Sequence, residues 1–177
     1  MKKNVLGTKF SILMINIKSG FLLKFSIIFI IFLIDQISKY YVVSILDGQQ
    51  NEIYLTSFLN LYLIWNEGIA FGLFGFENKI IYNFFTILII AVLTFVLYLL
   101  ITTKDYRSYF YVMIFGGACG NLIDRLRYSS VPDFIDFHIY NFHWFIFNVA
   151  DIFISLGVFC LIIAEIIINK INDYEKN

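Results

Sequence analysis

Four long apolar stretches dominate the chain, and the segments outside them carry most of its charged residues. The stretches cover approximately residues 21–43, 80–103, 106–123 and 149–168. A helix needs about 20 apolar residues to cross the hydrocarbon core of a bilayer. Each stretch is therefore predicted to be a transmembrane helix, which makes the chain an all-α membrane protein with four spans.

The third stretch, 106–123, has the weakest apolar character of the four because three glycines dilute it. Two of them, Gly116 and Gly120, form a G-x-x-x-G pair. Small residues at this spacing let a neighbouring helix approach closely in a membrane. Close helix packing is therefore expected around this pair.

Composition agrees with a membrane protein and excludes some functions. The chain has 177 residues, of which 60% are hydrophobic and 21 are Phe, whereas soluble domains contain about 45–50% apolar residues. The length fits a single integral membrane domain, 1–177. The net charge is zero, so the chain lacks the basic surface of a nucleic-acid-binding protein. Cys119 and Cys160 fall in apolar stretches and are expected to be small buried residues.

Loop charges predict the orientation of the spans. Five lysines precede residue 25, Lys104 and Arg107 follow the second stretch, and Lys170 and Lys176 follow the fourth. Cytoplasmic loops carry an excess of Lys and Arg. Both termini, including the tail 1–20, are therefore predicted to be cytoplasmic. No small-residue cleavage site follows the first stretch, so it is expected to be retained as a span.

The outer segments are then approximately 44–79 and 124–148. Within the first, residues 53–65 alternate in part between apolar and polar positions, which predicts short strands and a small extracytoplasmic sheet. The second is rich in Tyr, Phe and Trp and is predicted to be an outer loop segment, anchored by aromatic residues at the membrane interface.

Five aspartates gather near the outer face under this topology: Asp35, Asp124, Asp133, Asp136 and Asp151. Acids in or near the hydrocarbon region are costly, and their presence indicates a functional site. Several of them also have a structural explanation, which must be weighed first.

Three of the five have a simple structural or solvated role. Asp35 and Lys39 are four residues apart on one helix and are predicted to form a buried ion pair. Asp124 precedes Arg125 at a helix end, where either a local ion pair or a role in anchoring substrate is expected. Asp136 is interpreted as a solvated loop acid.

Asp133 and Asp151 differ from Asp35 and Asp124 because no cation lies within four residues of either. Asp151 begins a helix, where a carboxylate also serves as a cap. Two carboxylates that share a site do not ionise together, so one keeps a proton. The charged one can then accept a proton from water while the neutral one polarises a carbonyl. A membrane-embedded aspartyl hydrolase is therefore a coherent hypothesis.

The sequence lacks the motifs that other hydrolytic mechanisms require. The chain has no H-E-x-x-H motif, and His138 and His143 are five apart, which does not place them on one face of a helix. There is no G-x-S-x-G motif. No metal and no cofactor are expected.

Five short motifs resemble those of the bacterial lipoprotein signal peptidases, also called signal peptidase II. They occur in the family's order and are Asp35-Gln-Ile-Ser-Lys39, Asn66-Glu-Gly-Ile-Ala-Phe71, Gly116-Gly-Ala-Cys-Gly-Asn-Leu-Ile-Asp-Arg125, Val131-Pro-Asp-Phe134 and Phe147-Asn-Val-Ala-Asp151. One departure is Pro132, which precedes Asp133 and removes a backbone donor. The similarity covers nearly all of the chain after the N-terminal tail.

The resemblance implies an aspartyl endopeptidase of the bacterial plasma membrane. Such enzymes remove the signal peptide from a prolipoprotein, just before a cysteine that carries diacylglyceryl. Asp133 and Asp151 match the family's catalytic dyad. Positions that bind substrate or support the site match Asn66, Gly68, Asn121, Asp124, Arg125 and Asn148. Contact with membrane lipids and a monomeric state are expected.

The alternative from another class is a small proton-coupled transporter that uses the same aspartates as a relay. A carrier is expected to place its acids near the bilayer midplane, at broken helices. Here the acids cluster toward the outer ends of the spans, which favours the peptidase.

Overall fold

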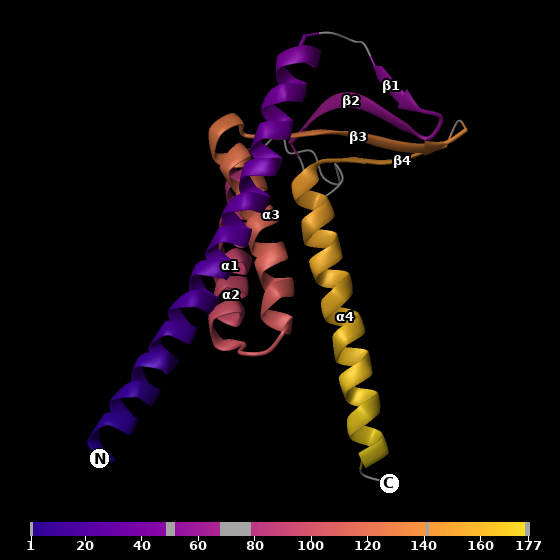
Figure 1. Cartoon of the computed structure of the whole chain (residues 1–177). Coiled ribbons are helices and arrows are strands. Elements are labelled where there is room, and N and C mark those ends of the chain that lie inside the picture. The colour runs from indigo at the N-terminus through magenta and orange to yellow at the C-terminus, as the bar shows by residue number, and fades with distance from the viewer. Residues whose placement is uncertain (1, 49–51, 68–78, 141, 176–177) are drawn as a thin grey trace.

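The computed structural model describes the backbone of residues 2–48, 52–67, 79–140 and 142–175 and the side chains of 20–48, 52–67, 82–140 and 142–168. The described residues form four helices and one four-stranded sheet (Figure 1). The helices are α1 (Lys2–Leu46), α2 (Lys79–Thr102), α3 (Arg107–Tyr128) and α4 (Val149–Glu175). The strands are β1 (Ile53–Thr56), β2 (Leu59–Asn66), β3 (Val131–Ile139) and β4 (Phe142–Phe147).

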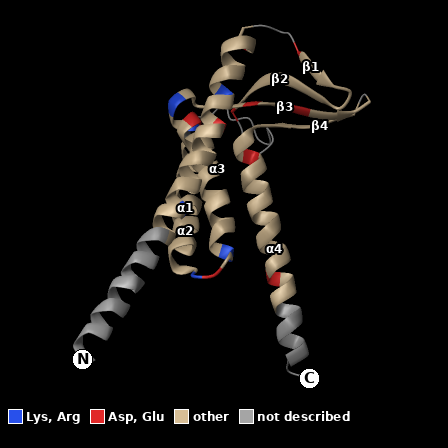
Figure 2. Ribbon diagram, viewed as in Figure 1, with Lys and Arg blue, Asp and Glu red and all other residues tan. Residues whose placement is uncertain are grey.

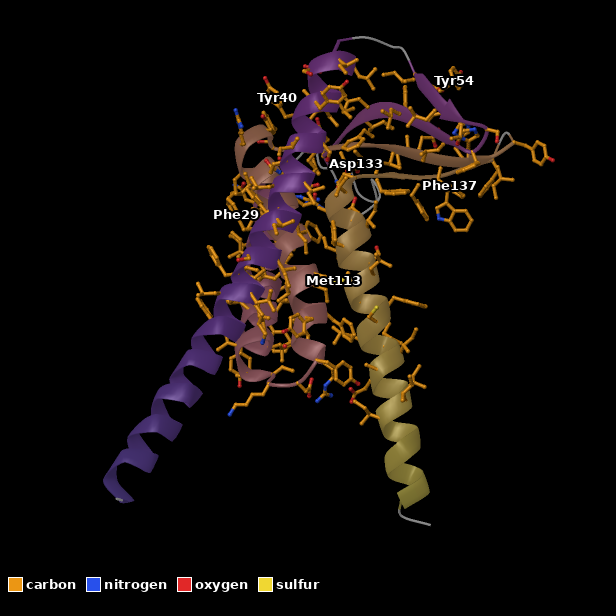
Figure 3. The ribbon with its side chains drawn as sticks, in the orientation of Figure 1. Phe29, Tyr40, Tyr54, Met113, Asp133 and Phe137 are labelled. Atoms are coloured by element: carbon orange, nitrogen blue, oxygen red, sulfur yellow. The ribbon has the colours of Figure 1, made fainter. Side chains whose placement is uncertain are left out.

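Three helices have the length and composition needed to cross a membrane. Among the described residues these are Gly20–Leu46, Tyr82–Thr102 and Val149–Ile168, with mean hydropathies of 2.1, 2.9 and 2.5. Their apolar side chains face outward: Phe29 and Tyr40 of α1 point away from the other helices (Figure 3) and are 51% and 78% exposed. Such surfaces require lipid as their solvent. The fourth span, in α3, stays a prediction.

The charged residues of the described helices gather mainly in two zones (Figure 2). One zone lies where the helices meet the sheet, and the other lies at the α2–α3 connection. The helical segments between these zones carry few charges. This separation matches a protein whose middle layer faces hydrocarbon.

Glycines let the other helices approach α3, which packs against α1, α2 and α4. A Cβ atom at Gly116 would lie 3.2 Å from the Ile31 side chain of α1, and one at Gly117 would lie 2.6 Å from the Ala150 carbonyl oxygen of α4. A Cβ atom at Gly120 would overlap the Asp35 carboxylate. The close approach predicted from the G-x-x-x-G pair is confirmed.

Gly120→Ala is expected to destabilise the protein by about 1–3 kcal/mol, since the new methyl group must displace a buried carboxylate. Gly20→Ala is the matched control, because a Cβ atom there meets nothing within 4 Å. Unfolding by sodium dodecyl sulfate in mixed micelles measures both. Equal stability of the two variants would contradict the packing argument.

The sheet is antiparallel throughout, in the order β1-β2-β3-β4. Strands β1 and β2 confirm the strands predicted within 53–65. The second outer segment differs from its prediction: α3 continues to Tyr128, and β3 and β4 form a hairpin in place of a loop. Pro132 and two aspartates obscure the alternation of β3, and its partner strand β2 lies far away in the sequence.

Pro132 is accommodated because of where β3 lies at that point. Pro132 pairs with Trp65 of β2, whereas the pairing of β3 with β4 begins at Ile135 and Phe147. Among the described strands, Pro132 therefore has only β2 beside it. A proline is tolerated where one side of a strand needs no ladder hydrogen bond.

Candidate active site

Asp133 and Asp151 reach one cavity from different elements. Asp133 lies on β3, where the sheet meets the helices (Figure 3), and Asp151 lies in the first turn of α4. Both line a cavity of about 220 Å³. The other lining residues are Asn66, Ile89, Ala118, Asn121, Arg125, Val131, Ile154 and Ser155. Apolar side chains thus share the wall of the cavity with a convergent set of polar and charged groups, as is common in substrate-binding pockets.

Two side-chain amides hold the Asp133 carboxylate. Asn148 Nδ2 donates to Oδ1 at 2.6 Å, and Asn66 Nδ2 donates to Oδ2 at 2.8 Å. Asp133 and Asn148 are almost fully buried, and Asn66 is 8% exposed. Because buried amides with fixed partners have few rotamers left, both oxygens of Asp133 are held in position.

Asp151 belongs to a reciprocal cap at the start of α4. Its backbone N–H donates to Asn148 Oδ1 at 3.1 Å, and the Asn148 backbone N–H donates to Asp151 Oδ2 at 3.2 Å. This arrangement is a capping box with Asn and Asp in place of the usual Ser and Glu. Asn121 Nδ2 donates to the remaining oxygen, Oδ1, at 2.8 Å. The capping role considered for Asp151 is therefore real, and it coexists with exposure to the cavity.

Lys39 connects this site to a buried ionic network. Its ammonium group donates to Asp35 Oδ2 at 2.7 Å, to Asp124 Oδ2 at 2.7 Å and to Asn121 Oδ1 at 2.8 Å. An ammonium group has three N–H donors, so all of them are used. The predicted Asp35–Lys39 ion pair is confirmed and extends to Asp124. Through Asn121, the network also orients the amide that holds Asp151.

The network also ties α1 to the beginning of α4. Asp35 Oδ1 accepts the Ala150 backbone N–H at 2.9 Å, which is one of the N–H groups that a helix leaves free in its first turn. Gln36 Nε2 bonds to both Asp35 and Asp124 at 3.2 Å. Gln36 was missed from the sequence, although its place directly after Asp35 was a usable signal.

Asp124 forms its ion pair with Lys39 of α1, which is 85 residues away in the sequence, whereas the sequence had suggested the adjacent Arg125. Arg125 is 9% exposed and lines the cavity beside the two acids. Its backbone carbonyl accepts the Tyr82 hydroxyl at 2.9 Å, which fastens α2 to this end of α3.

Two other predicted residues lie apart from these. Gly68 is outside the described residues. The prediction that Asp136 is a solvated loop acid is wrong, because Asp136 belongs to β3 and is only 2% exposed. Its Oδ2 atom forms a hydrogen bond with His143 Nδ1 at 2.8 Å. Asp136 lies between its cross-strand neighbours Asn60 of β2 and Ile146 of β4, whose side chains flank it on both sides.

The electrostatic surroundings favour a proton on the pair. Burial raises the pKa of Asp133 to about 6, and the negative charge of Asp151 acts in the same direction. The amides of Asn66 and Asn148 and the charge of Lys39 oppose this shift. A carboxyl group with a pKa near 6 can both hold and release a proton close to neutral pH.

Apolar helices that hold a buried and a half-buried carboxylate beside one cavity beneath a sheet are typical of a membrane enzyme with acid–base chemistry. The chain belongs to the signal peptidase (SPase) II family, whose model matches residues 27–167. It is therefore a protease that processes lipoproteins.

Relatives of known sequence and structure agree with this family. The lipoprotein signal peptidase of Pelagibacter ubique is 48% identical over 164 residues, which are 92% of this chain and 98% of that protein. That of Thermodesulfovibrio yellowstonii is 46% identical over 132 residues, or 74% of this chain and 86% of that one. A solved bacterial membrane enzyme superposes with a TM-score of 0.71 at 29% identity, over 81% of this chain and 87% of that one.

Proposed function

We propose that the protein removes the signal peptide from diacylglyceryl-modified prolipoproteins, cutting just before the lipidated cysteine, with Asp133 and Asp151 as its catalytic dyad. The main support is that the two carboxylates line one cavity while separate amide donors hold each of them. The transporter alternative is not supported. A transporter is expected to hold its acids near the bilayer midplane, whereas the aspartates of this protein lie where the helices meet the sheet.

In the proposed mechanism the two acids share one proton. Asp151, charged, accepts a proton from water, and the resulting hydroxide attacks the scissile carbonyl carbon. Asp133, protonated, donates a hydrogen bond to the carbonyl oxygen as negative charge develops on it. Asp151 then gives the proton that it took from water to the leaving nitrogen as the C–N bond breaks, which returns both acids to their starting states. Asn66, Asn121 and Asn148 position the acids, and Arg125 is placed to bind a backbone carbonyl of the substrate.

The acyl chains of the substrate are proposed to lie beside the dyad. A second, almost wholly apolar pocket of about 380 Å³ adjoins Asp151 between β4 and α4. Its lining residues are Trp144, Phe145, Phe147, Asp151, Ile152, Ser155 and Leu156. Apolar walls next to a polar cavity suit a substrate that joins a lipid to a peptide.

The proposed topology places four spans in the bacterial plasma membrane, with α3 as the fourth. The dyad and the sheet would face the extracytoplasmic side, and both termini would be cytoplasmic. The support is the position of Lys104 and Arg107 at the α2–α3 connection, at the opposite end of the helices from the sheet (Figure 2). A monomeric state stays a prediction.

The pH dependence of cleavage follows from the raised pKa of Asp133. Below about pH 6 this group holds the proton that the mechanism needs, and above it both acids become charged. The value of kcat/KM is therefore expected to fall as pH rises through about 6, approaching tenfold per pH unit. Initial rates at low substrate concentration between pH 5 and 8 measure it. A profile that rises throughout this range would contradict the assignment of the proton donor.

A direct assay tests the function. Purified protein in detergent is incubated with a prolipoprotein that carries diacylglyceryl-cysteine, and the product is examined by mass spectrometry. The expected product begins at the modified cysteine, and the same precursor without lipid is the control. Cleavage elsewhere, or proton flux in liposomes without cleavage, would overturn the proposal.

A further inference from the structure

A second group of polar side chains lies on the β3–β4 hairpin, outside the cavity that holds the dyad. Its members are Asp136, His138 and His143, whose potential ligand atoms all lie within 4.8 Å of one another. The two histidines are cross-strand partners, and their rings stack with centroids 5.2 Å apart. They are also the only histidines of the sequence.

Hydrogen bonds within the protein leave this group incomplete. Asp136 Oδ2 lies 2.8 Å from His143 Nδ1 and 4.0 Å from His138 Nδ1. Asp136 Oδ1 and His138 Nδ1 are buried without a hydrogen-bond partner among the described residues. Asn60 is the cross-strand partner of Asp136, and its Oδ1 atom is also buried without a hydrogen-bond partner among the described residues. Most buried polar atoms in proteins have a partner, so three such atoms at one place indicate a missing ligand.

We propose that Asp136, His138 and His143 bind a divalent transition-metal ion of the Zn²⁺ type. Two imidazole nitrogens and one carboxylate are a common ligand set for Zn²⁺, whereas Ca²⁺ and Mg²⁺ prefer oxygen ligands alone. A tetrahedral ion about 2.0–2.1 Å from its ligands separates them by roughly 3.3 Å. Asp136 Oδ2 lies 2.8 Å and 4.0 Å from the two Nδ1 atoms, and all three ligand atoms lie within 4.8 Å of one another, so modest side-chain rotations bring them to this spacing. Water supplies the fourth ligand.

The ion has a structural role in this hairpin. Two ligands come from β3 and one from β4, so the ion links the two strands, and it does so beside the irregularity in their register between Asp136 and His138. Strand β3 also carries Asp133, and β4 leads directly to Asn148. None of the three ligands lines the cavity of the dyad among the described residues, so the ion stabilises the sheet without entering the reaction.

Metal titration tests the site. Metal-free protein in detergent, with any histidine tag removed, is titrated with Zn²⁺ by isothermal titration calorimetry. One equivalent is expected to bind. His143→Ala is expected to weaken binding by at least tenfold, and this side chain is 51% exposed, so the variant should fold. Phe142→Ala, which removes an exposed ring from the adjacent position, is the matched control and should bind as the original protein does.

Two further measurements distinguish this site from other zinc ligands. His138→Ala should cause a similar loss of Zn²⁺ affinity. Adding Zn²⁺ should slow hydrogen exchange of the β3–β4 amides in the original protein but not in the two histidine variants. Replacing Zn²⁺ by Co²⁺ should give visible absorption bands without the near-ultraviolet thiolate band that Cys119 or Cys160 would produce. Absence of stoichiometric binding, a thiolate band, or unchanged affinity in both histidine variants would overturn the proposal.

Discussion

Replacement of Asp133 or Asp151 by asparagine is expected to lower the rate of prolipoprotein cleavage by roughly 10³–10⁴-fold. The amide group is close in size to the carboxylate, so the cavity keeps its shape. The amide group can neither hold the shared proton nor accept a proton from water. At Asp133 the new amide must also present an NH₂ group to Asn66 or Asn148, which already donate there. Single-turnover cleavage of a lipidated precursor measures the loss.

The control is Asp47→Asn, which makes the same substitution at an exposed residue directly after the end of α1. Its rate is expected to stay within about twofold of the original, as for most exposed substitutions. All three variants should insert into the membrane in equal amounts. Near-normal cleavage by either dyad variant would refute the proposed mechanism. The double variant should be no slower than the worse single variant, because the two acids act as one unit.

Lys39→Met is expected to destabilise the protein by about 3–5 kcal/mol and to lower activity strongly. Lys39 is 3% exposed, and its ammonium group is the cation bonded to both Asp35 and Asp124. Removing the ammonium group leaves the two buried carboxylates beside each other without its positive charge. Asn121 Oδ1 also loses the hydrogen bond that Lys39 donates to it. Detergent unfolding monitored by tryptophan fluorescence measures the stability.

The matched control is Lys24→Met on the same helix, which is half-buried and is expected to change stability by less than about 1 kcal/mol. Adding Asp124→Asn to Lys39→Met should restore part of the loss, since one buried charge is then removed. If Lys39→Met is as stable as Lys24→Met, the network does not stabilise the bundle.

The helices and the candidate dyad could be predicted because their signals are local. Long apolar stretches define α1, α2 and α4, and the four-residue spacing of Asp35 and Lys39 defines their pair. The absence of nearby cations set Asp133 and Asp151 apart from Asp35 and Asp124, and the resemblance of the Val131–Phe134 motif to the family favoured Asp133 over Asp136. Each of these inferences uses residues within one element or its neighbours.

Long-range pairing could not be predicted in the same way. Asn60 and Asp136 are cross-strand partners with two helices between them in the sequence, so the burial of Asp136 has no local signal. The argument that His138 and His143 lie on different faces holds for a helix. In a hairpin the same separation makes them direct partners. Lys39 likewise reaches Asp124 only because Gly120 admits α1.

Asn148 has a consequence for how the protein matures in the membrane. This one residue caps α4, bonds to Asp151 by its backbone and holds Asp133 by its amide. A shift of the start of α4 by one residue would turn Asp151 by about 100° around the helix axis and withdraw the amide from Asp133. Asp133 is also synthesised before α4, so a nascent chain carries the first acid without its partner. In the proposed mechanism both acids are required, so cleavage activity is expected only once α4 is seated in register.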